Sequence, residues 1–454
     1  MAYSERLAEF AHELRFDDIP EPVRQRAKYL ILDSLGIALA ASRFPFAPKF
    51  LAGLQGLAEP GNSSVIGMSA KLPLRDAALI NSALVHGLDF DDTHMKAVVH
   101  ATAVSLPTAL SVGEHTGTDG REFLVAYLIG METAIRLGMA SNFGFHHRGL
   151  HATGIVGHFS SALVAGRLLG LDAAALTAAQ GSTAQASQQF IDDGAWNKRL
   201  HPGWAATAGI TAAGLAGSGF VAPRETYEGR FGVYKTMVSD FDACDLSQIS
   251  DGLGERWEAA ESAVKPFPTC HFTHAAADAA LILRQRHNIN ADDIVRIRAR
   301  LPAETFPFVV EPVANKLKPA SDYDAKFSTQ FIVAACFRRG RFGLDELDDA
   351  SLNDPAILDL AAKVECEVDS DADFPRVYPG GLIVTTADGG DYAHHEPVNR
   401  GAAERALSGD EIVEKFNANA ERAVSTAKAR EISDLVLDID NHDARKLAET
   451  LSGV

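Results

Sequence analysis

Residues 27–42, with the sequence AKYLILDSLGIALAAS, decide the fold class of this chain. Apolar and small side chains occur all round a helix drawn through this stretch, so the helix is expected to be buried on most sides. Residues 75–90, 121–138, 160–170 and 205–220 have the same character. Because helices lined with alanine and glycine can approach one another closely, these stretches predict a domain of many packed helices.

The composition changes after Pro266. Residues 293–301 alternate apolar and basic side chains, which is typical of a strand, and residues 364–369 also read as a strand. Residues 380–392 predict a further strand that ends in a Gly-Gly turn. Residues 327–340 predict a helix between these strands.

This order predicts a mostly α fold with two parts. Residues 1–265 and 401–454 are expected to form one large helical domain from both chain ends. Residues 266–400 are expected to form a smaller α+β lid domain. Two short features support helix starts within this scheme: Asp172 as an N-cap, and Ser408 with a glutamate three residues later as a capping box.

The overall composition limits the partners and the compartment. The chain has 454 residues, 46% hydrophobic and 22% charged, with a formal net charge of −18. So acidic a chain repels nucleic acid and anionic membranes, and it can bind an anionic substrate only through a local cluster of cations. The four cysteines are widely spaced, and no stretch has the length of a membrane span. A reducing cytoplasm with free thiols is the expected location.

Ionisable side chains gather in the motif HGLDFDDTH, which begins at His86. If the preceding helix continues through this motif, His86, Asp89 and Thr93 lie on one helix face. Asp91 and Asp92 then point elsewhere, where we expect them to be solvated or to cap the helix. Buried helices rarely carry so many ionisable groups without partners, so the motif is a candidate site.

A second cluster is HHRGLHATGIVGHF, residues 146–159. His147 and His151 are four residues apart, but the glutamate of an HExxH zinc motif is missing. His147 and His158 are interpreted as structural histidines. His151 precedes an expected helix start, where free backbone N–H groups can bind an anion, and it is a candidate functional residue.

A third cluster, DDGAWNKRLHPGWAA, supplies the local positive charge that an anionic substrate requires. Lys198, Arg199 and His201 lie between Trp196 and Trp204 in a segment with glycine and proline. A solvated loop is the alternative interpretation, and the two tryptophans argue against full exposure.

Lys265, in AVKPFPTCHFTH, lies where the composition changes, and clefts commonly form at such domain junctions. The sequence contains no GxGxxG fingerprint after a strand, no Walker A loop and no GxSxG elbow. These absences argue against an enzyme that uses a nicotinamide cofactor or a nucleotide.

Taken together, HGLDFDDTH, RGLHATGIVGHF, DDGAWNKRLHPGWAA, EGRFGVY and VKPFPTC resemble the MmgE/PrpD family from the first helix to near the C-terminus. That family includes 2-methylcitrate dehydratase, cis-aconitate decarboxylase and iminodisuccinate epimerase. The resemblance implies a homodimer whose protomer has a helical domain and an α+β lid, with the active site between them. It also implies that no metal and no organic cofactor is required.

The resemblance also assigns site residues. The positions that match the motifs are the candidate catalytic residues Asp89, Thr93, His100, His151, Lys198 and Lys265. Arg199, His201 and His86 are the candidate substrate-binding residues. The sequence departs from the decarboxylase at Phe331, where a tyrosine is expected, and this departure argues against assigning that activity alone.

The expected function is that of a cofactor-independent lyase that acts on a small di- or tricarboxylate by removing a proton next to a carboxylate. His151 or His100 would handle the proton, and Lys198 and Lys265 would hold the carboxylates. Three alternatives remain open: an epimerase of an iminodisuccinate-like dicarboxylate that uses two bases, a metabolite-binding protein without activity, and a metalloenzyme.

Overall fold

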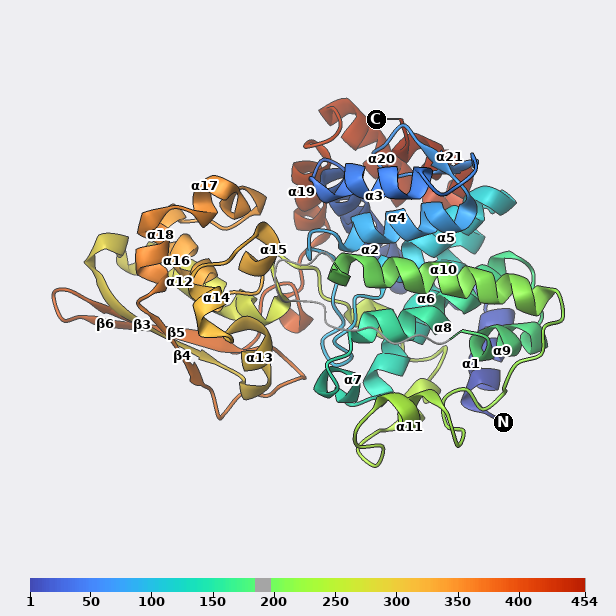
Figure 1. Cartoon of the computed structure of the whole chain (residues 1–454), viewed down its shortest axis with the longest axis horizontal. Helices are drawn as coiled ribbons and strands as arrows, with labels where there is room; N and C mark the ends of the chain where they lie inside the picture. Colours follow the sequence, from blue (N-terminus) through green and yellow to red (C-terminus); the bar gives the residue numbers. More distant parts are fainter. Residues whose placement is uncertain (184–196, 454) are drawn as a thin grey trace.

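The computed structural model describes residues 1–183 and 197–453. Most of this chain is helical, and a smaller lobe with a four-stranded sheet projects from one side of a helical body (Figure 1). The expected fold class, mostly α with a smaller α+β part, is therefore confirmed. We refer to residues 266–400 as the lid lobe and to the rest as the helical body.

The helical body draws its elements from both ends of the chain. They are α1 (Tyr3–Glu13), α2 (Glu21–Ala41), α3 (Phe46–Gln55), α4 (Leu74–His86), α5 (Thr102–Thr116), α6 (Gly120–Ala140), α7 (Gly144–His147), α8 (Ala152–Leu168), α9 (Ala173–Gly181), α10 (Asn197–Gly217), α11 (Val233–Met237), α19 (Gly409–Ala420), α20 (Thr426–Leu437) and α21 (Ala444–Leu451), with a short hairpin of β1 (Ser63–Ser64) and β2 (Lys71–Leu72). Asp172 caps α9, and Ser408 and Glu411 form the expected capping box of α19.

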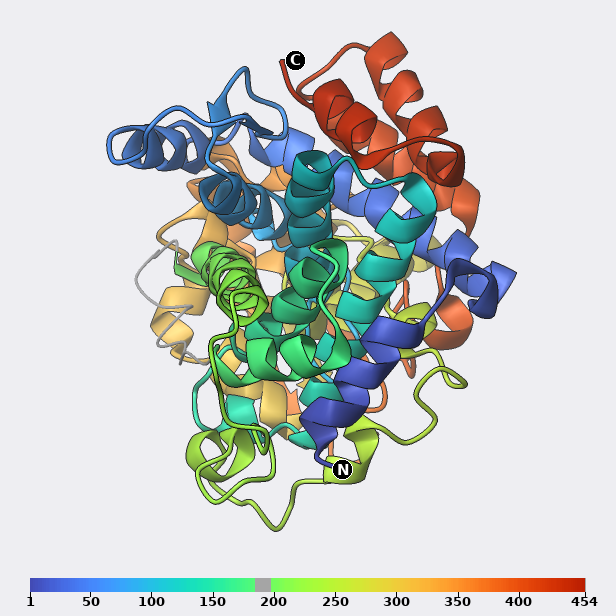
Figure 2. The ribbon, with the colours of Figure 1, turned by 90° about the vertical axis from the view of Figure 1, so that its right-hand side faces the viewer.

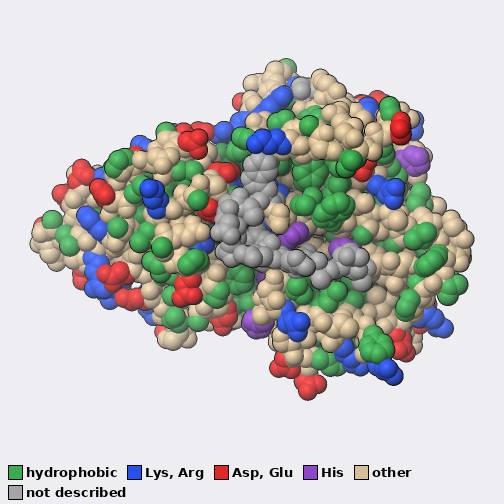
Figure 3. Space-filling view, viewed as in Figure 1, with side chains coloured by type: hydrophobic (Ala, Val, Ile, Leu, Met, Phe, Trp, Pro, Cys, Tyr) green, Lys and Arg blue, Asp and Glu red, His purple; other side chains and the backbone are tan. Residues whose placement is uncertain are grey.

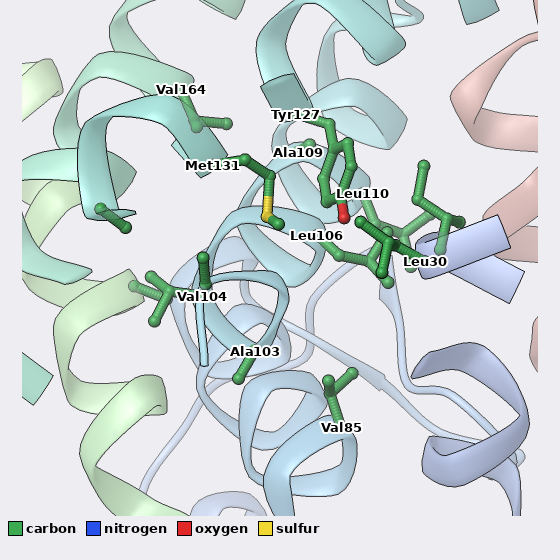
Figure 4. Close-up of a cluster of buried hydrophobic side chains, with 14 of the residues drawn as sticks. Leu30, Val85, Ala103, Val104, Leu106, Ala109, Leu110, Tyr127, Met131 and Val164 are labelled. Atoms are coloured by element: carbon green, nitrogen blue, oxygen red, sulfur yellow. The ribbon is translucent and has the colours of Figure 1, made fainter. Parts of the chain in front are cut away.

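The core of the body lies where α2, α4, α5, α6 and α8 meet. Leu30, Val85, Leu106, Tyr127 and Val164, one from each of these helices, point into one cluster (Figure 4). Small alanines between these side chains let the helix backbones approach closely. The C-terminal helices join the same body, because α19 packs on α2 and α21 packs on α5 (Figure 2).

Helix α6 is long and apolar enough to cross a membrane by length and composition. However, 94% of its most apolar window is buried inside the protein. Helices α2 and α3 pass the same test only as a pair, and they are bent by 85° at the break between them. These features fit the core helices of the body.

The lid lobe has a mixed sheet with helices on one side. Its elements are α12 (His274–His287), β3 (Ile294–Leu301), α13 (Phe306–Val309), α14 (Val313–Leu317), α15 (Asp322–Ala325), α16 (Thr329–Arg339), α17 (Asp349–Leu352), α18 (Pro355–Ala361), β4 (Val364–Val368), β5 (Gly380–Thr386) and β6 (Asp391–Glu396). The strand order is β4-β3-β5-β6, with β3 parallel to β4 and antiparallel to β5. Helices α12 and α16 pack on the sheet and build a second hydrophobic core.

One local prediction is wrong. Helix α4 ends at His86 instead of continuing to Thr93, because the chain turns after Gly87 and Asp89 takes a left-handed φ of 51°. The segment for which a solvated loop was the alternative interpretation begins α10 at its first described residue, Asn197, and Pro202 lies inside that helix. Lys198 and Arg199 are buried there, although Trp204 is 52% exposed. Trp196 lies outside the described residues.

Candidate active site

The acidic motif forms a buried loop between α4 and α5. Its backbone carbonyls need hydrogen-bond donors away from water, and four side chains supply them. The pairs are the Gly87 carbonyl with Arg199 Nε at 2.7 Å, the Asp89 carbonyl with Lys265 Nζ at 2.9 Å, the Phe90 carbonyl with Lys415 Nζ at 2.9 Å and the Asp92 carbonyl with His100 Nδ1 at 2.8 Å. Three distant parts of the chain, together with His100 from the same connection, therefore hold this loop, which we call the 87–92 loop.

Asp89 lies between two buried lysines at the centre of the loop. Lys198 Nζ donates to Asp89 Oδ2 at 2.8 Å, and Lys265 donates to Asp89 Oδ1. Burial alone would raise the pKa of Asp89, but the two ammonium groups outweigh it and hold this pKa well below its ordinary value. One carboxylate thus fixes two cations side by side.

His86 connects Lys198 to a second aspartate. Its Nδ1 lies 2.9 Å from Asp91 Oδ2, and its Nε2 lies 2.9 Å from Lys198 Nζ. Because an ammonium group only donates, His86 must accept at Nε2 and carry its hydrogen on Nδ1, where Asp91 accepts it. Burial lowers the pKa of His86, which keeps the ring neutral in this chain of hydrogen bonds.

Asp91 and Asp92 are fully buried, which corrects the expectation that they are solvated or cap a helix. Burial raises the pKa of Asp91, but the neighbouring His86 and His100 outweigh it and lower this pKa. Burial and the charge of Asp91 raise the pKa of Asp92 to about 7. The cause of the wrong prediction is the early end of α4, which turns the whole motif into the interior.

His100 presents its second ring nitrogen as a base. Its Nδ1 faces the Asp92 carbonyl, and Thr93 Oγ1 lies 3.3 Å from the same atom. A carbonyl only accepts, so Nδ1 carries the hydrogen and Nε2 keeps its lone pair. Burial lowers the pKa of His100 well below its ordinary value, and the charges of Lys198 and Lys265 lower it further.

His151 lies beside these groups at the N-terminus of α8, as its position before the expected helix start predicted. Its ring stacks on that of His86, with centroids 5.5 Å apart, and its Nδ1 lies 3.2 Å from His201 Nδ1. Burial and the charge of Lys198 lower the pKa of His151 well below its ordinary value. His201 is only partly buried, one turn after Lys198 on α10.

These side chains line a pocket between the helical body and the lid lobe. The pocket is lined by Asp89, Thr93, Val98, His100, His146, His151, Lys198, Lys265, Cys270, His271, Phe272, Phe308, Phe327 and Tyr378. Figure 3 shows histidine side chains in the middle of this face of the molecule, between the lobe and the body.

The structure brings the six candidate catalytic residues together in this pocket and places the other candidates around it. His86 and His201 do not line the pocket. His86 contacts the lining residue Lys198, and His201 contacts the lining residue His151. Arg199 points away: its guanidinium lies between the rings of Phe46 and Tyr323, 4.6 and 4.1 Å from their centroids. Arg199 therefore supports the 87–92 loop and does not line the pocket.

The lid wall contains residues that sequence reasoning missed, namely His271, Phe327 and Tyr378, and His146 was missed in the helical body. His271 directly follows the VKPFPTC motif, and that position was the available signal. Phe331 is fully buried in the core of the lid lobe and does not line the pocket. The residue of the same KFSTQF stretch that lines the pocket is Phe327.

Three histidines of the site form a possible set of metal ligands. His86, His100 and His151 offer ring nitrogens within 4.8 Å of one another. However, both nitrogens of His86 are engaged, and the Lys198 ammonium lies 2.9 Å from Nε2, where a metal ion would be repelled. This donor set does not fit a metal ion.

The arrangement combines the parts needed to build negative charge next to a carboxylate. It has a neutral imidazole with a lone pair and two ammonium groups at fixed points. The fold and site thus define a two-domain protein whose pocket, between a helical body and an α+β lobe, contains two lysine ammonium groups.

The chain belongs to the MmgE/PrpD family. The MmgE/PrpD N-terminal domain matches residues 5–244, and the MmgE/PrpD C-terminal domain matches residues 267–441. The chain is similar to cis-aconitate decarboxylase of Aspergillus terreus, with 26% identity over 98% of this chain and 95% of the relative. It is also similar to human cis-aconitate decarboxylase, with 27% identity over 99% of this chain and 94% of the relative. These relatives support an enzyme of this family.

Proposed function

We propose that this protein is a cofactor-independent lyase that acts on a small di- or tricarboxylate. The observation that carries the proposal is the pair of ammonium groups held on Asp89 in the same pocket as the ring of His100. Lys198 and Lys265 each keep donors for a substrate carboxylate, and His100 is in place to move a proton at the neighbouring carbon. Asp91 and His86 maintain the charge and orientation of Lys198.

Decarboxylation is the favoured form of this reaction, because the relatives are named for it. In an unsaturated acid of the cis-aconitate type, the bond to one carboxylate breaks and CO₂ leaves. The electron pair of that bond forms the new carbon–carbon double bond, and the far carbon of the old double bond takes a proton. Lys198 is the candidate acid because it joins a chain of hydrogen bonds through His86 to Asp91.

A dehydratase reaction would use the same groups in a different order. His100 Nε2 would remove the proton next to a carboxylate, and an ammonium group would protonate the leaving hydroxyl. Thr93, whose Oγ1 lies 3.3 Å from His100 Nδ1, would help to orient the His100 ring.

An epimerase is the second candidate. The pocket has imidazoles on both walls, with His100 and His151 on the helical body and His271 on the lid lobe. Two bases on opposite faces of a substrate carbon are what epimerisation needs, and no group leaves.

One experiment separates these functions. The protein is incubated in deuterated water with cis-aconitate, with citrate-like hydroxy acids and with iminodisuccinate, and the products are followed by NMR. Decarboxylation gives CO₂ and a deuterated product, dehydration gives an alkene, and epimerisation gives exchange without net loss of any group. Tight binding without turnover of any of these acids would contradict the proposal and favour a metabolite-binding protein.

The role of the cations is tested with Lys198→Ala. We expect kcat/KM to fall by about 100-fold or more, because an oriented charge on the developing anion is removed. Lys446→Ala changes an exposed lysine on α21 and is the matched control. A Lys198→Ala enzyme with unchanged kcat/KM would remove the central assignment.

We further propose that the protein acts as a homodimer in the cytoplasm, as the family resemblance and the composition suggest. Light scattering of the purified protein measures the first point, with a mass of about 97 kDa expected from two chains of 48.5 kDa. Fractionation of cells that produce the protein measures the second.

A further inference from the structure

His271 is a pocket histidine whose tautomer can be read from its neighbours. It belongs to the short helix η4 (His271–Thr273) on the lid side and is only 3% exposed. Its Nε2 lies 2.6 Å from Asn399 Nδ2. Its Nδ1 is buried and has no hydrogen-bond partner among the described residues.

The orientation of the Asn399 amide decides which nitrogen of His271 carries hydrogen. The backbone N–H of Tyr378 donates to Asn399 Oδ1 at 3.3 Å. Since an N–H can only donate, the oxygen of the amide must face Tyr378 and the NH₂ group must face His271. The NH₂ group also only donates, so His271 Nε2 must be an acceptor without hydrogen.

From this geometry, we propose that Asn399 is a positioning residue that holds neutral His271 with its hydrogen on Nδ1, so that the ring gives an N–H donor to the substrate. The role rests on the proposed function, because the donor would bind a carboxylate or the charge that develops on it. A buried donor without a partner is costly, and a bound anion would satisfy it.

The surroundings keep the ring neutral. Burial lowers the pKa of His271 well below its ordinary value, and the charge of Lys265 lowers it further, while Asp89 and the backbone of Arg400 act in the opposite direction. His274, whose ring lies 4.5 Å away, has Nε2 facing the Thr269 carbonyl at 3.3 Å. His274 is therefore expected to have the opposite tautomer and serves as an internal reference.

The tautomer is measured directly with histidine labelled with ¹⁵N, by two-bond ¹H–¹⁵N correlation spectra of the full-length protein near neutral pH without substrate. His271→Gln assigns the signals. The expected wild-type spectrum shows hydrogen on Nδ1 of His271 and on Nε2 of His274. Hydrogen on Nε2 of His271 in the wild type would overturn the proposal.

Asn399→Asp tests whether Asn399 determines the tautomer of His271. Both carboxyl oxygens accept, so the hydrogen of His271 is expected to move to Nε2, and kcat is expected to fall by about 100-fold with KM changed by less than about threefold. Asn290→Asp, at an exposed asparagine of the same lobe whose oxygen accepts from the Asp292 N–H, is the matched control and should change neither quantity. Retention of hydrogen on Nδ1 in Asn399→Asp, or a tautomer change with full kcat, would overturn the role of Asn399.

The two proposals fail in different ways. If the spectra show the expected tautomers and no carboxylate is turned over, the proposed function is wrong and the tautomer assignment stands. If an acid is turned over and the wild type has hydrogen on Nε2 of His271, only the role of Asn399 is wrong.

Discussion

At the scale of single residues, His100 shows how burial prepares a base. Its Nδ1 is tied to a carbonyl, and burial together with two nearby ammonium groups lowers its pKa. The ring therefore stays unprotonated, and able to take a proton, at pH values below those at which an exposed histidine gains its charge.

In a reaction that begins by removing a proton next to a carboxylate, His100→Asn is expected to lower kcat by about 100-fold to 10,000-fold, because the general base is removed. In the wild type, the acidic limb of kcat/KM against pH should lie below about pH 6.5, since the pKa of the base is lowered. Steady-state rates across a pH series measure both. His147→Asn, at an exposed histidine of α7, is the control. An acidic limb above that pH would contradict the assignment of His100.

Asp92 links stability to pH in the opposite sense to an ordinary surface carboxylate. Its pKa is raised to about 7 in the folded protein, so folding favours the uncharged acid. The stability that this provides is complete below the ordinary pKa of aspartate and is lost as pH rises toward about 7. Asp92→Asn should therefore raise Tm more at about pH 8 than at about pH 5.

Thermal unfolding followed by circular dichroism at these two pH values measures that difference. Asp91→Asn is the matched neighbour: its pKa is lowered, so the charged form stabilises the fold and the substitution should lower Tm at neutral pH. Equal changes in Tm for Asp92→Asn at both pH values would show that this carboxyl does not titrate as described.

At the scale of elements, Lys198 is positioned by close contacts of α10. A Cβ atom on Gly203 would lie 2.4 Å from the Leu79 carbonyl of α4, and one on Gly209 would lie 2.0 Å from Ser161 Oγ of α8. Glycine at these two positions lets α10 approach both helices, and this approach brings Lys198 to Asp89. The position of Lys198 therefore depends on the distances between helix backbones, and glycines, not ionisable residues, set these distances.

Gly209→Ala is expected to push α10 away from α8, lowering Tm and reducing kcat/KM by about tenfold or more, since small displacements of a catalytic group are costly. Gly214→Ala on the same helix is the control, because a Cβ there meets nothing within 4 Å. Alanine is the better helix former, so this control should keep full activity and gain up to about 1 kcal/mol of stability. Similar effects of both substitutions would contradict the packing role.

The elements also show which features a sequence can predict. The helix at residues 27–42 was predictable, because a helix that is buried on all sides has apolar residues all round. The strand at residues 294–301 was predictable, because a strand that is buried on one face alternates apolar and polar residues. The end of α4 was missed although the motif carries a stop signal, a histidine in the last turn followed by Gly87. The turn that follows requires a left-handed Asp89. That conformation is maintained by Lys265 and Lys415, which are far away in the sequence.

The same limit applies to the site. Residue types identified Lys198 and Lys265 as candidates, and matching motifs grouped them with His100 and His151. His271 and Tyr378 could not be placed in the pocket from periodicity, because their position depends on how the lid lobe docks. Arg199 shows the reverse: a cation beside Lys198 on the helix turns toward aromatic rings and a carbonyl.

At the scale of the whole molecule, the C-terminal helices contribute to the site through one contact. Lys415 of α19 binds Asp33 of α2 at 2.8 Å and the Phe90 carbonyl at 2.9 Å. Its ammonium also lies 3.8 Å from the centroid of the Phe90 ring. A helix near the end of the chain thereby fixes the loop that carries Asp89.

Lys415→Met is expected to lower Tm, because it leaves Asp33 buried without its cation, and to reduce kcat by about tenfold or more because the loop loses a donor. In the double variant Lys415→Met with Asp33→Leu the unpaired charge is absent, so Tm should partly recover while kcat stays low. Activity that recovers together with Tm would show that Lys415 acts on stability alone. Lys428→Met on α20 is the control for a partly exposed lysine.

The four donors on the 87–92 loop set the order in which a newly made chain becomes competent. Arg199 and Lys265 leave the ribosome well before Lys415, so the nascent chain can build most of its helices while one carbonyl of the loop still lacks its donor. Catalytic competence should then appear only after α19 has emerged and docked. A fragment ending near residue 400 should be helical and inactive, and adding a separate peptide of residues 401–454 should restore turnover.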